Sequence, residues 1–309
     1  MTLDLVGFGA HSADRQRWVD GLPALHSAVL EQWELVSDGA AMPGSCSLVF
    51  PVRTAGGQPA ALKLGWPHPE ATHEHLALRH WAGQGAVRLI RADPRRHVLL
   101  LERAGNGRDL SALTDVEACL AVAGLYPQLH IAAPPQLRQL SEVVADWGAR
   151  LRRLPRTAPV PRRYVEQAAA LASDFAADGD SDGRLVHADL HFDNVLAGTR
   201  TGTCTGTGTG QAWLAIDPKP LSGDPHYEVA PLLHNRWDEL AATGNLRTAI
   251  RARFHTVVDA ADLDEDRARD WAVVRELVTV LWALDDGDPP DELAATVTRA
   301  VTVAKAVQE

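Results

Sequence analysis

The chain has 309 residues, of which 46% are hydrophobic and 23% charged, an ordinary balance for a globular protein of one or two domains. Its net charge of −10 argues against a nucleic-acid partner, because phosphate binding needs a basic face. We expect neither a membrane span nor a signal peptide, since no long apolar run is present. Three scattered cysteines, Cys46, Cys119 and Cys204, indicate a reducing, cytoplasmic setting without structural disulfides.

The first third of the chain has the pattern of a helix followed by short strands. Apolar residues recur every three or four positions between Asp14 and Glu34, which predicts the helix. Strands are predicted at residues 33–37, 46–52, 59–65, 86–91 and 97–103. Pro69 opens a second helix that ends near Trp81. We therefore expect residues 33–103 to form a small antiparallel sheet with one inserted helix.

Helices dominate the remainder, with candidates at residues 115–130, 137–154, 165–177 and from 228 onward. Two short strands, 194–197 and 211–216, flank a Thr/Gly tract at residues 199–210. Glycine and threonine at this density cannot bury a core, so we interpret the tract as a flexible, enlarged hairpin tip. The whole pattern predicts an α+β fold.

One loop carries the residues for a specific chemistry. Polar residues from His187 to Asn194 lie between short apolar runs, and a later strand ends in Asp217. Transfer of a γ-phosphoryl group needs a base for the acceptor hydroxyl and Mg²⁺, which prefers oxygen ligands. Asp189 suits the base, while the Asn194 amide and the Asp217 carboxylate suit the metal. Each residue alone is more typical of a loop cap or a turn, so only the combination supports this interpretation.

The pattern His187-x-Asp189-x-x-x-x-Asn194, followed by Ile216-Asp217, resembles the catalytic loop and metal-binding acid of the aminoglycoside phosphotransferases and their protein-kinase-like relatives. Other segments resemble this family in the same order along the chain: Ala61-Leu62-Lys63-Leu64, Glu74 on the following helix, Leu99 to Arg103, Leu129-His130, and Gly223-Asp224-Pro225. Residues 213–237 are most similar to the streptomycin 6-phosphotransferase and hydroxyurea phosphotransferase group. Ala188 and the Thr/Gly tract depart from that group.

This resemblance implies a bilobal fold, with a nucleotide-binding lobe at residues 1–104 and a catalytic, acceptor-binding helical lobe at residues 105–309. It implies that ATP and Mg²⁺ bind between the lobes. Lys63 would contact the α- and β-phosphates and pair with Glu74, with Glu70 as the alternative partner. Only Lys63, Lys219 and Lys305 are lysines among the 30 basic residues, which makes the position of Lys63 notable. Asp189 would be the base, Asn194 and Asp217 would hold Mg²⁺, and the remaining nucleotide contacts would be Ser45, Glu102 and Arg103.

A cationic acceptor would need carboxylates near Asp189. The candidates are Asp193, Asp224, Glu228, Asp285 and Asp286. The resemblance favours streptomycin as the acceptor, with hydroxyurea or another small hydroxyl compound as the alternative. The sequence does not select an oligomeric state.

Two other classes of protein stay open at this point. His187-x-Asp189-x-His191 has alternating potential metal ligands, as in a metal-dependent hydrolase. That interpretation leaves Lys63, Glu74 and Asn194 without a role. The second class is a catalytically silent module that binds nucleotide, although lysine, base, amide and metal acid are all present.

Overall fold

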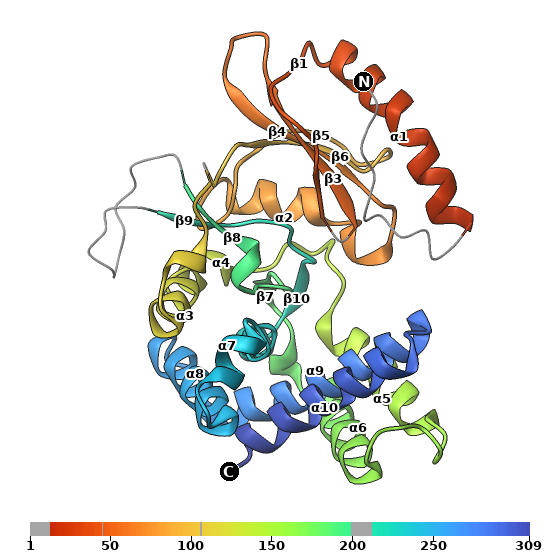
Figure 1. Cartoon of the computed structure of the whole chain (residues 1–309), viewed down its shortest axis with the longest axis vertical. Helices are drawn as coiled ribbons and strands as arrows, with labels where there is room; N and C mark the ends of the chain where they lie inside the picture. Colours follow the sequence, from red (N-terminus) through yellow and green to blue (C-terminus); the bar gives the residue numbers. More distant parts are fainter. Residues whose placement is uncertain (1–12, 45, 106, 199–211) are drawn as a thin grey trace.

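The structure is a computed structural model that describes residues 13–44, 46–105, 107–198 and 212–309. A twisted sheet forms the upper part of the molecule, and a larger helical part lies below it (Figure 1). The combination of an antiparallel sheet with many helices confirms the predicted α+β class.

The upper sheet is antiparallel, with strand order β1-β3-β4-β6-β5, and β2 pairs with the free part of β3. Its strands are β1 (Val36–Ser37), β2 (Met42–Pro43), β3 (Ser47–Arg53), β4 (Pro59–Gly65), β5 (Leu89–Asp93) and β6 (Val98–Glu102). The five predicted strands are present, and β2 is an additional strand that the sequence analysis did not predict. A two-residue strand is too short to produce an alternating pattern. The strand predicted at residue 86 begins at Leu89, because Ala86 instead bridges to Ala215.

The two faces of the sheet have different partners. Helix α1 (Ala13–Gln32) lies along the outer face, where Leu22 and Val29 pack on Leu62 and Leu64. Successive strand residues point to opposite faces, so Lys63 faces the inner side of the sheet. This alternation in β4 fixes the direction of the lysine toward the helical part.

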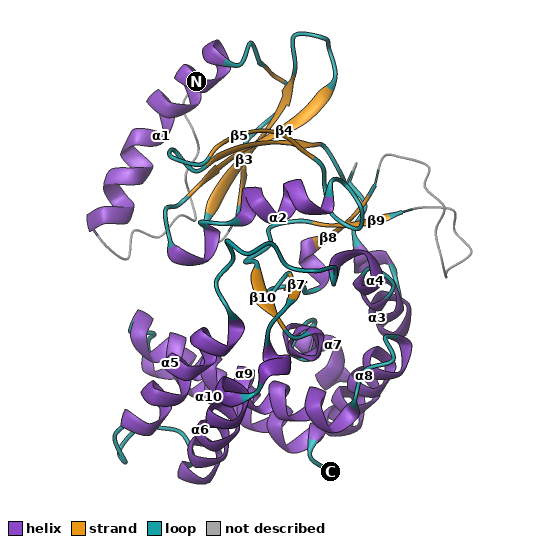
Figure 2. Ribbon diagram, turned by 180° about the vertical axis from the view of Figure 1, so that it is seen from behind, coloured by secondary structure: helices purple, strands orange, loops and turns teal. Residues whose placement is uncertain are grey.

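Helix α2 (Glu74–Trp81) lies beneath the inner face of the sheet, between the sheet and the lower part (Figure 2). The predicted helix from Pro69 is divided in the structure. A 3₁₀ turn, η1 (Pro69–Ala71), comes first, and α2 begins only at Glu74. The helix ends at Ala82, whose left-handed backbone, with a φ of 51°, stops the helical hydrogen bonding.

The lower part is mainly helical, and its helices are α3 (Asp115–Ala123), α4 (Tyr126–Leu129), α5 (Leu140–Arg153), α6 (Arg162–Ala177), α7 (Trp237–Ala242), α8 (Leu246–Ala260), α9 (Glu265–Asp286) and α10 (Pro290–Val307). The single helix predicted at residues 115–130 is broken into α3 and α4. Pro127 explains the break, because a proline cannot donate the hydrogen bond that would continue α3. It is accommodated in the first turn of α4.

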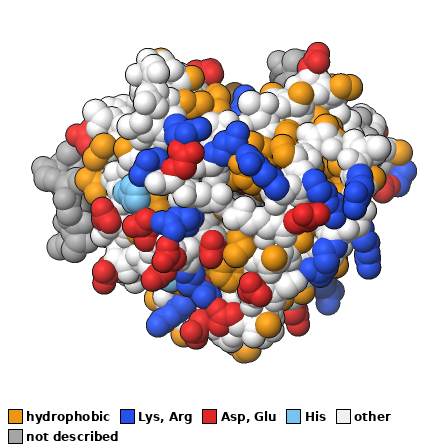
Figure 3. All heavy atoms as spheres, turned by 90° about the horizontal axis from the view of Figure 1, so that it is seen from below, with side chains coloured by type: hydrophobic (Ala, Val, Ile, Leu, Met, Phe, Trp, Pro, Cys, Tyr) orange, Lys and Arg blue, Asp and Glu red, His pale blue; other side chains and the backbone are white. Residues whose placement is uncertain are grey.

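Helix α9 is the centre of the lower core. Trp271 on α9 is fully buried and stacks on Phe175 of α6, with the ring centroids 3.8 Å apart. Acidic and basic side chains are interspersed over the lower face of the molecule (Figure 3). In the part of the chain that the structure describes, no helix combines the length and hydrophobicity needed to cross a lipid bilayer.

Two small antiparallel ladders link the sheet to the helices. Strand β7 (Arg184–Val186) pairs with β10 (Leu221–Gly223), and β8 (Val195–Ala197) pairs with β9 (Trp213–Ala215). The β8–β9 hairpin was predicted, and the Thr/Gly tract with Cys204 lies outside the described residues. Because β7 precedes the loop from His187 to Asn194 and β8 follows it, both ends of this loop are anchored in a ladder.

Candidate active site

A cleft of about 510 Å³ lies between the upper sheet and the helical part. Most of the residues predicted to contact nucleotide, metal or the acceptor hydroxyl line it: Lys63, Glu74, Glu102, Arg103, Asp189, Asn194 and Asp217. Ser45 lies outside the described residues, although Gly44 and Cys46 on either side of it also line the cleft. The fold therefore brings together side chains from distant parts of the sequence.

Lys63 is the central cation of this cleft. Its Nζ atom lies 2.7 Å from Oε1 of Glu74 and 2.8 Å from Oε2, and it also contacts the carboxylate of Asp217. The partner of Lys63 is thus Glu74, and the alternative, Glu70, lies elsewhere. Burial alone would lower the pKa of Lys63, but the two carboxylates outweigh it and raise that pKa. The lysine is held as a cation, which suits phosphate binding.

Asp217 follows β9 with a left-handed backbone, at a φ of 57°. This turn directs its carboxylate toward Lys63 rather than along the strand. Burial by itself would raise the pKa of Asp217, but the attraction of Lys63 outweighs it and lowers that pKa. A carboxylate that stays ionised in a cleft is the type of ligand that Mg²⁺ prefers.

Two buried side chains fix the loop that carries Asp189. Burial lowers the pKa of His187 to about 4, so its ring is neutral; Nε2 donates to the carbonyl of Ile216 at 2.9 Å. Oε1 of Glu228 accepts a 2.6 Å hydrogen bond from the amide of Ala188, which has a left-handed φ of 64°. The residue before the predicted base is thus held in a strained backbone conformation.

Asn194 lies across the same loop. Its Nδ2 donates to the carbonyl of Asp189 at 2.8 Å and lies 3.1 Å from Nε2 of His191. With the amide nitrogen used in this way, Oδ1 is the atom left to act as a metal ligand. One amide oxygen and one carboxylate fit a magnesium ion that takes its other ligands from phosphates and water.

Lys219 also belongs to this site, and the sequence analysis gave it no role. Its Nζ lies 2.8 Å from Oδ2 of Asp189, and its backbone amide donates to the carbonyl of His187 at 2.9 Å. The rarity of lysine in this chain was the one signal that could have identified it. Its position two residues after Asp217 places it beside the predicted base.

Glu102 and Arg103 lie at the end of β6, where the sheet meets the lower part. Oε1 of Glu102 accepts from the backbone amide of Arg88 at 3.0 Å. The Arg103 guanidinium donates to the carbonyl of Ala60 at 3.1 Å and to that of Val52 at 2.6 Å. Both side chains are therefore used within the sheet, which leaves the backbone of this segment as the part that could contact a nucleotide base.

Asp224 and Glu228 were predicted to contact the acceptor, but both lie inside the fold. The Asp224 carboxylate accepts from Trp271 at 2.6 Å and pairs with Arg267. Glu228 is fully buried, and burial raises its pKa to about 8. Gly223 before them is required by packing, because a Cβ atom there would lie 2.7 Å from Val186. Glu228 thus holds the loop from His187 to Asn194, and Asp224 binds side chains of α9, so neither acid lines either of the two cavities.

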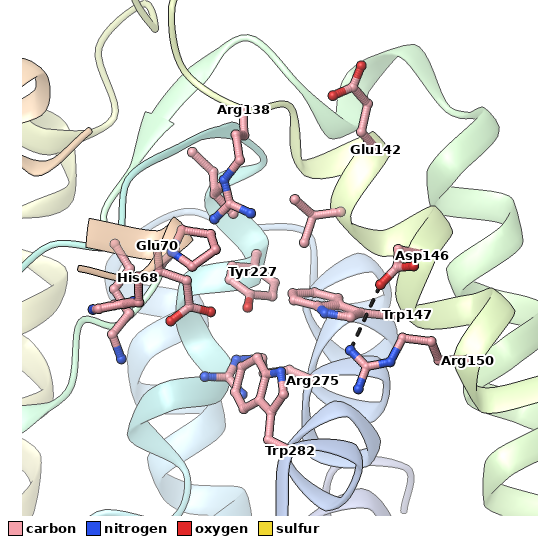
Figure 4. A pocket seen from close by; sticks show the side chains of 15 residues that line it. His68, Glu70, Arg138, Glu142, Asp146, Trp147, Arg150, Tyr227, Arg275 and Trp282 are labelled. Carbon is pink, nitrogen blue, oxygen red and sulfur yellow. Dashed lines mark ion pairs between the residues drawn. The ribbon is translucent and has the colours of Figure 1, made fainter. Parts of the chain in front are cut away.

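A second cavity, of about 520 Å³, adjoins the first. Its wall contains Trp147 and Trp282, whose rings meet edge to face at a centroid distance of 5.9 Å, and Tyr227. Figure 4 shows the carboxylate of Glu70 directed into the cavity. His68 and Lys219 line both cavities, so the second cavity opens close to Asp189.

This second cavity contains charges of both signs. The guanidinium of Arg275 lies over the ring of Trp282, 4.0 Å from its centroid, and Arg138 lies on the opposite side (Figure 4). Arg150 pairs with Asp146 at 3.9 Å and with Asp285 at the rim. Sequence reasoning missed most of the residues around this cavity, because they come from separate segments, among them η1, α5 and α9, and share no local motif.

The other predicted acceptor contacts have separate positions. Asp193 is exposed at the edge of the first cleft, where its carboxylate lies 3.4 Å from Nδ1 of His191. Asp285 is half exposed at the end of α9, and Asp286 beside it is exposed. Neither Asp285 nor Asp286 lines the second cavity directly.

The alternating residues His187, Asp189 and His191 do not assemble into a metal cluster. His187 bonds to a backbone carbonyl, and His191 lies against the Asn194 amide. Among the residues that the structure describes, no group of three or more His, Cys, Asp or Glu side chains is placed to hold a metal ion. The geometry gives the hydrolase interpretation no support.

The fold is of the protein-kinase-like class. A thermostable aminoglycoside phosphotransferase, solved with ADP and hygromycin B, aligns with a TM-score of 0.60 at 19% identity over 92% of this chain and 98% of its own. A choline/ethanolamine kinase family protein from Mesorhizobium loti aligns with a TM-score of 0.62 at 17% identity, over 94% and 95% of the two chains. At these identities the two structures establish the fold.

The sequence comparisons establish the family. Residues 32–287 match the family described as aminoglycoside/hydroxyurea antibiotic resistance kinase, and the chain belongs to this family. It is 37% identical to streptomycin 6-kinase of Streptomyces glaucescens over 97% of this chain and 93% of that protein. It is 40% identical to hydroxyurea phosphotransferase of Kitasatospora aureofaciens over 94% and 80% of the two chains. The chain is therefore a phosphotransferase, and the predicted resemblance is confirmed.

Proposed function

We propose that this chain transfers the γ-phosphoryl group of Mg·ATP to a hydroxyl group of a small molecule, and that this acceptor is an aminoglycoside of the streptomycin type. The observation that carries the proposal is the meeting of Lys63, Asp189, Asn194 and Asp217 in one cleft, next to a second cavity. The similarity to streptomycin 6-kinase and hydroxyurea phosphotransferase supports this acceptor class. Hydroxyurea or another small hydroxyl compound is the alternative.

In this proposal the nucleotide lies in the first cleft, between a lobe of residues 1–104 and a lobe of residues 105–309. Lys63 contacts the α- and β-phosphates, held in place by Glu74. Asn194 and Asp217 hold Mg²⁺, which offsets the charge of the phosphates when it is bound. The backbone near Glu102 and Arg103 contacts the base. A cytoplasmic location, where ATP is available, accords with this activity.

Asp189 orients the acceptor hydroxyl and receives its proton. Its Oδ2 pairs with Lys219, and the loop around it is fixed through His187 and Glu228. A base whose backbone is fixed in this way keeps the hydroxyl oxygen in line with the phosphorus, which is the main protein contribution to phosphoryl transfer. The proton is transferred late, because the transition state of this reaction is loose.

The acceptor occupies the second cavity. Its aromatic wall of Trp147, Tyr227 and Trp282 suits a ring, and the Glu70 carboxylate suits a guanidinium or ammonium group. The cavity opens beside Asp189, so a hydroxyl at one end of the acceptor can reach the base. Glu70 replaces Asp224 and Glu228 as the proposed cation-binding acid, since those two carboxylates are used inside the fold.

The test is ADP release with Mg·ATP against a panel of streptomycin, other aminoglycosides, hydroxyurea and simple sugars. We expect turnover with streptomycin that Asp189→Asn lowers by about 10²- to 10⁴-fold, the usual contribution of a general base. Asp291→Asn, an exposed acid in the first turn of α10, is the matched control and should retain full activity.

Three outcomes would change the proposal. Full activity of Asp189→Asn would contradict the role of the base. Turnover with hydroxyurea alone would select the alternative acceptor. Binding of ATP without turnover of any acceptor in the panel would favour a silent module that only binds nucleotide. The residues described in the cleft do not favour that alternative.

A further inference from the structure

Lys219 occupies the junction between the two cavities. It lines both of them, and its Nζ lies 2.8 Å from Oδ2 of Asp189. Two of the three lysines in the chain, Lys63 and Lys219, therefore lie in one cleft, whereas the other basic residues, apart from Lys305, are arginines. A lysine in a chain that otherwise uses arginine indicates that a compact ammonium group is needed at this point.

The backbone around Lys219 holds its position relative to the catalytic loop. Its amide donates to the carbonyl of His187 at 2.9 Å, and Pro218 and Pro220 flank it. The preceding Asp217 forms the left-handed turn that separates Lys63 from Lys219. As a result one lysine contacts the metal-binding acid, and the other contacts the base.

Phosphoryl transfer creates a problem of charge at this junction. The γ-phosphate is anionic and must approach an acceptor hydroxyl that is itself held by the anionic Asp189. An ammonium group has three donors, so it can bond to a carboxylate and to a phosphoryl oxygen at the same time. Lys63 is not placed for this bridge, because its Nζ contacts Glu74 and Asp217, whereas the contact with Asp189 comes from Lys219.

We propose that Lys219 is a catalytic residue whose ammonium group bridges the Asp189 carboxylate and the phosphoryl group in transfer. This assignment rests on the proposed function. In the reaction the acceptor oxygen forms a bond to the γ-phosphorus, the bond from that phosphorus to the bridging oxygen breaks, and ADP leaves. The hydroxyl proton passes to Asp189, and Lys219 stays protonated, donating hydrogen bonds throughout.

The assignment predicts that Lys219 contacts ATP but not ADP, because only ATP carries the γ-phosphoryl group. We expect Lys219→Met to weaken binding of a non-hydrolysable ATP analogue with Mg²⁺ by about tenfold, the effect of one charge-assisted hydrogen bond. Binding of ADP should change less than about twofold. The conservative variant Lys219→Arg should recover part of the affinity for the analogue. Lys305→Met, at the third lysine, is the matched control and should change neither.

The same variants separate a catalytic role from a positioning role. We expect Lys219→Met to lower kcat by about 10²- to 10³-fold, as does removal of a single donor to a transition-state anion. If Lys219 only positions Asp189, kcat falls while the preference for the ATP analogue over ADP is unchanged, and the proposal is overturned. Unchanged kcat would overturn it as well.

The experiment distinguishes failure of the proposed function from failure of the role proposed for Lys219. If the unmodified chain transfers phosphate to no acceptor, that function fails, but the comparison of the ATP analogue with ADP needs no acceptor. If Lys219→Met binds the ATP analogue more weakly while its ADP binding is unchanged, the contact between Lys219 and the γ-phosphoryl group is still supported. If the affinity ratio of the analogue to ADP stays the same in this variant, the proposed contact is overturned. Circular dichroism of each variant verifies that the fold is intact, as expected for a side chain at a cavity surface.

Discussion

The two cavities have nearly the same volume, about 510 and 520 Å³, yet they are built in opposite ways. In the cleft that we propose for the nucleotide, the carboxylates of Glu74 and Asp217 both contact Lys63 and hold it in one network. In the cavity that we propose for the acceptor, charged side chains lie around an aromatic wall, and Glu70 and Arg138 face the space without an ion pair among the described residues. The first arrangement suits one fixed chemistry, whereas the second suits recognition that can change between relatives.

The largest effect should come from the network of the nucleotide cleft. Asp217→Asn removes the carboxylate that the proposal assigns to Mg²⁺, which is also one of the two carboxylates in contact with Lys63. We expect kcat/KM to fall by about 10³-fold, corresponding to several kcal/mol of lost charge stabilisation. Steady-state kinetics at increasing Mg²⁺ concentration provide the measurement.

Exposed acids provide the control for this variant. Asp291→Asn makes the same chemical change on α10, outside both cavities, and should leave kcat/KM within about twofold. Nearly normal activity of Asp217→Asn at ordinary Mg²⁺ concentration would show that the metal is held elsewhere in the cleft.

The contrast between the cavities also explains what the sequence could predict. Asp189, Asn194 and Asp217 lie in two short segments, and the period of a strand directs Lys63 inward, so local patterns were sufficient to select residues that meet in one cleft. Glu74 was correctly preferred to Glu70, although only the structure shows that η1 turns Glu70 toward the other cavity.

The acceptor cavity could not be predicted in this way. Trp147, Tyr227 and Trp282 come from three elements that meet only through the packing of α5, η5 (Pro225–Leu232) and α9. The acids Asp224 and Glu228 follow the metal acid closely in sequence, which made them plausible acceptor contacts. Their burial depends on Trp271 and Ala188, which no local pattern connects to them.

A smaller effect is expected for the acceptor cavity. Glu70→Gln removes the carboxylate that faces the cavity, and we expect the KM of a cationic aminoglycoside to rise about tenfold. The KM of ATP and the rate with a neutral acceptor such as hydroxyurea should hardly change. Kinetics with the two acceptors side by side would measure this difference.

Glu142→Gln is the matched control, because Glu142 lies at the rim of the same cavity with its carboxylate directed away from the aromatic rings (Figure 4). It should change the KM of either acceptor less than about threefold. Equal effects of the two variants would indicate that the cavity attracts cations by its general charge rather than through Glu70.

We expect the buried carboxyl group of Glu228 to make the stability of the protein depend on pH. Burial raises the pKa of Glu228 to about 8 from its ordinary value of 4.5, so the folded state holds a proton that the unfolded state releases. Stability from this group is complete below about pH 4.5 and is lost as the pH rises to about 8. Glu228→Gln, which stays neutral, should therefore gain a few degrees in Tm relative to the unmodified chain between pH 5 and pH 8.

Thermal unfolding at several pH values tests this difference, with Asp291→Asn as an exposed acid that should show no such trend. A difference in Tm that stays constant with pH would mean that Glu228 is ionised in the folded protein. The companion variant Glu228→Ala should be less stable at every pH, because it leaves the buried Ala188 amide without its acceptor, a cost of about 1–3 kcal/mol.

The smallest effect is expected at the end of α9, where the sequence suggested acceptor contacts. Asp285 pairs with Arg150 at the rim, but both side chains are partly exposed, and exposed ion pairs contribute at most about 1 kcal/mol. We expect Asp285→Asn to raise the KM of the acceptor less than about threefold, and Asp286→Asn, its exposed neighbour, to change nothing. A tenfold rise for Asp285→Asn alone would extend the acceptor site beyond the aromatic wall to this rim. The end of α9 would then be a direct determinant of acceptor specificity, in addition to the aromatic residues of the second cavity.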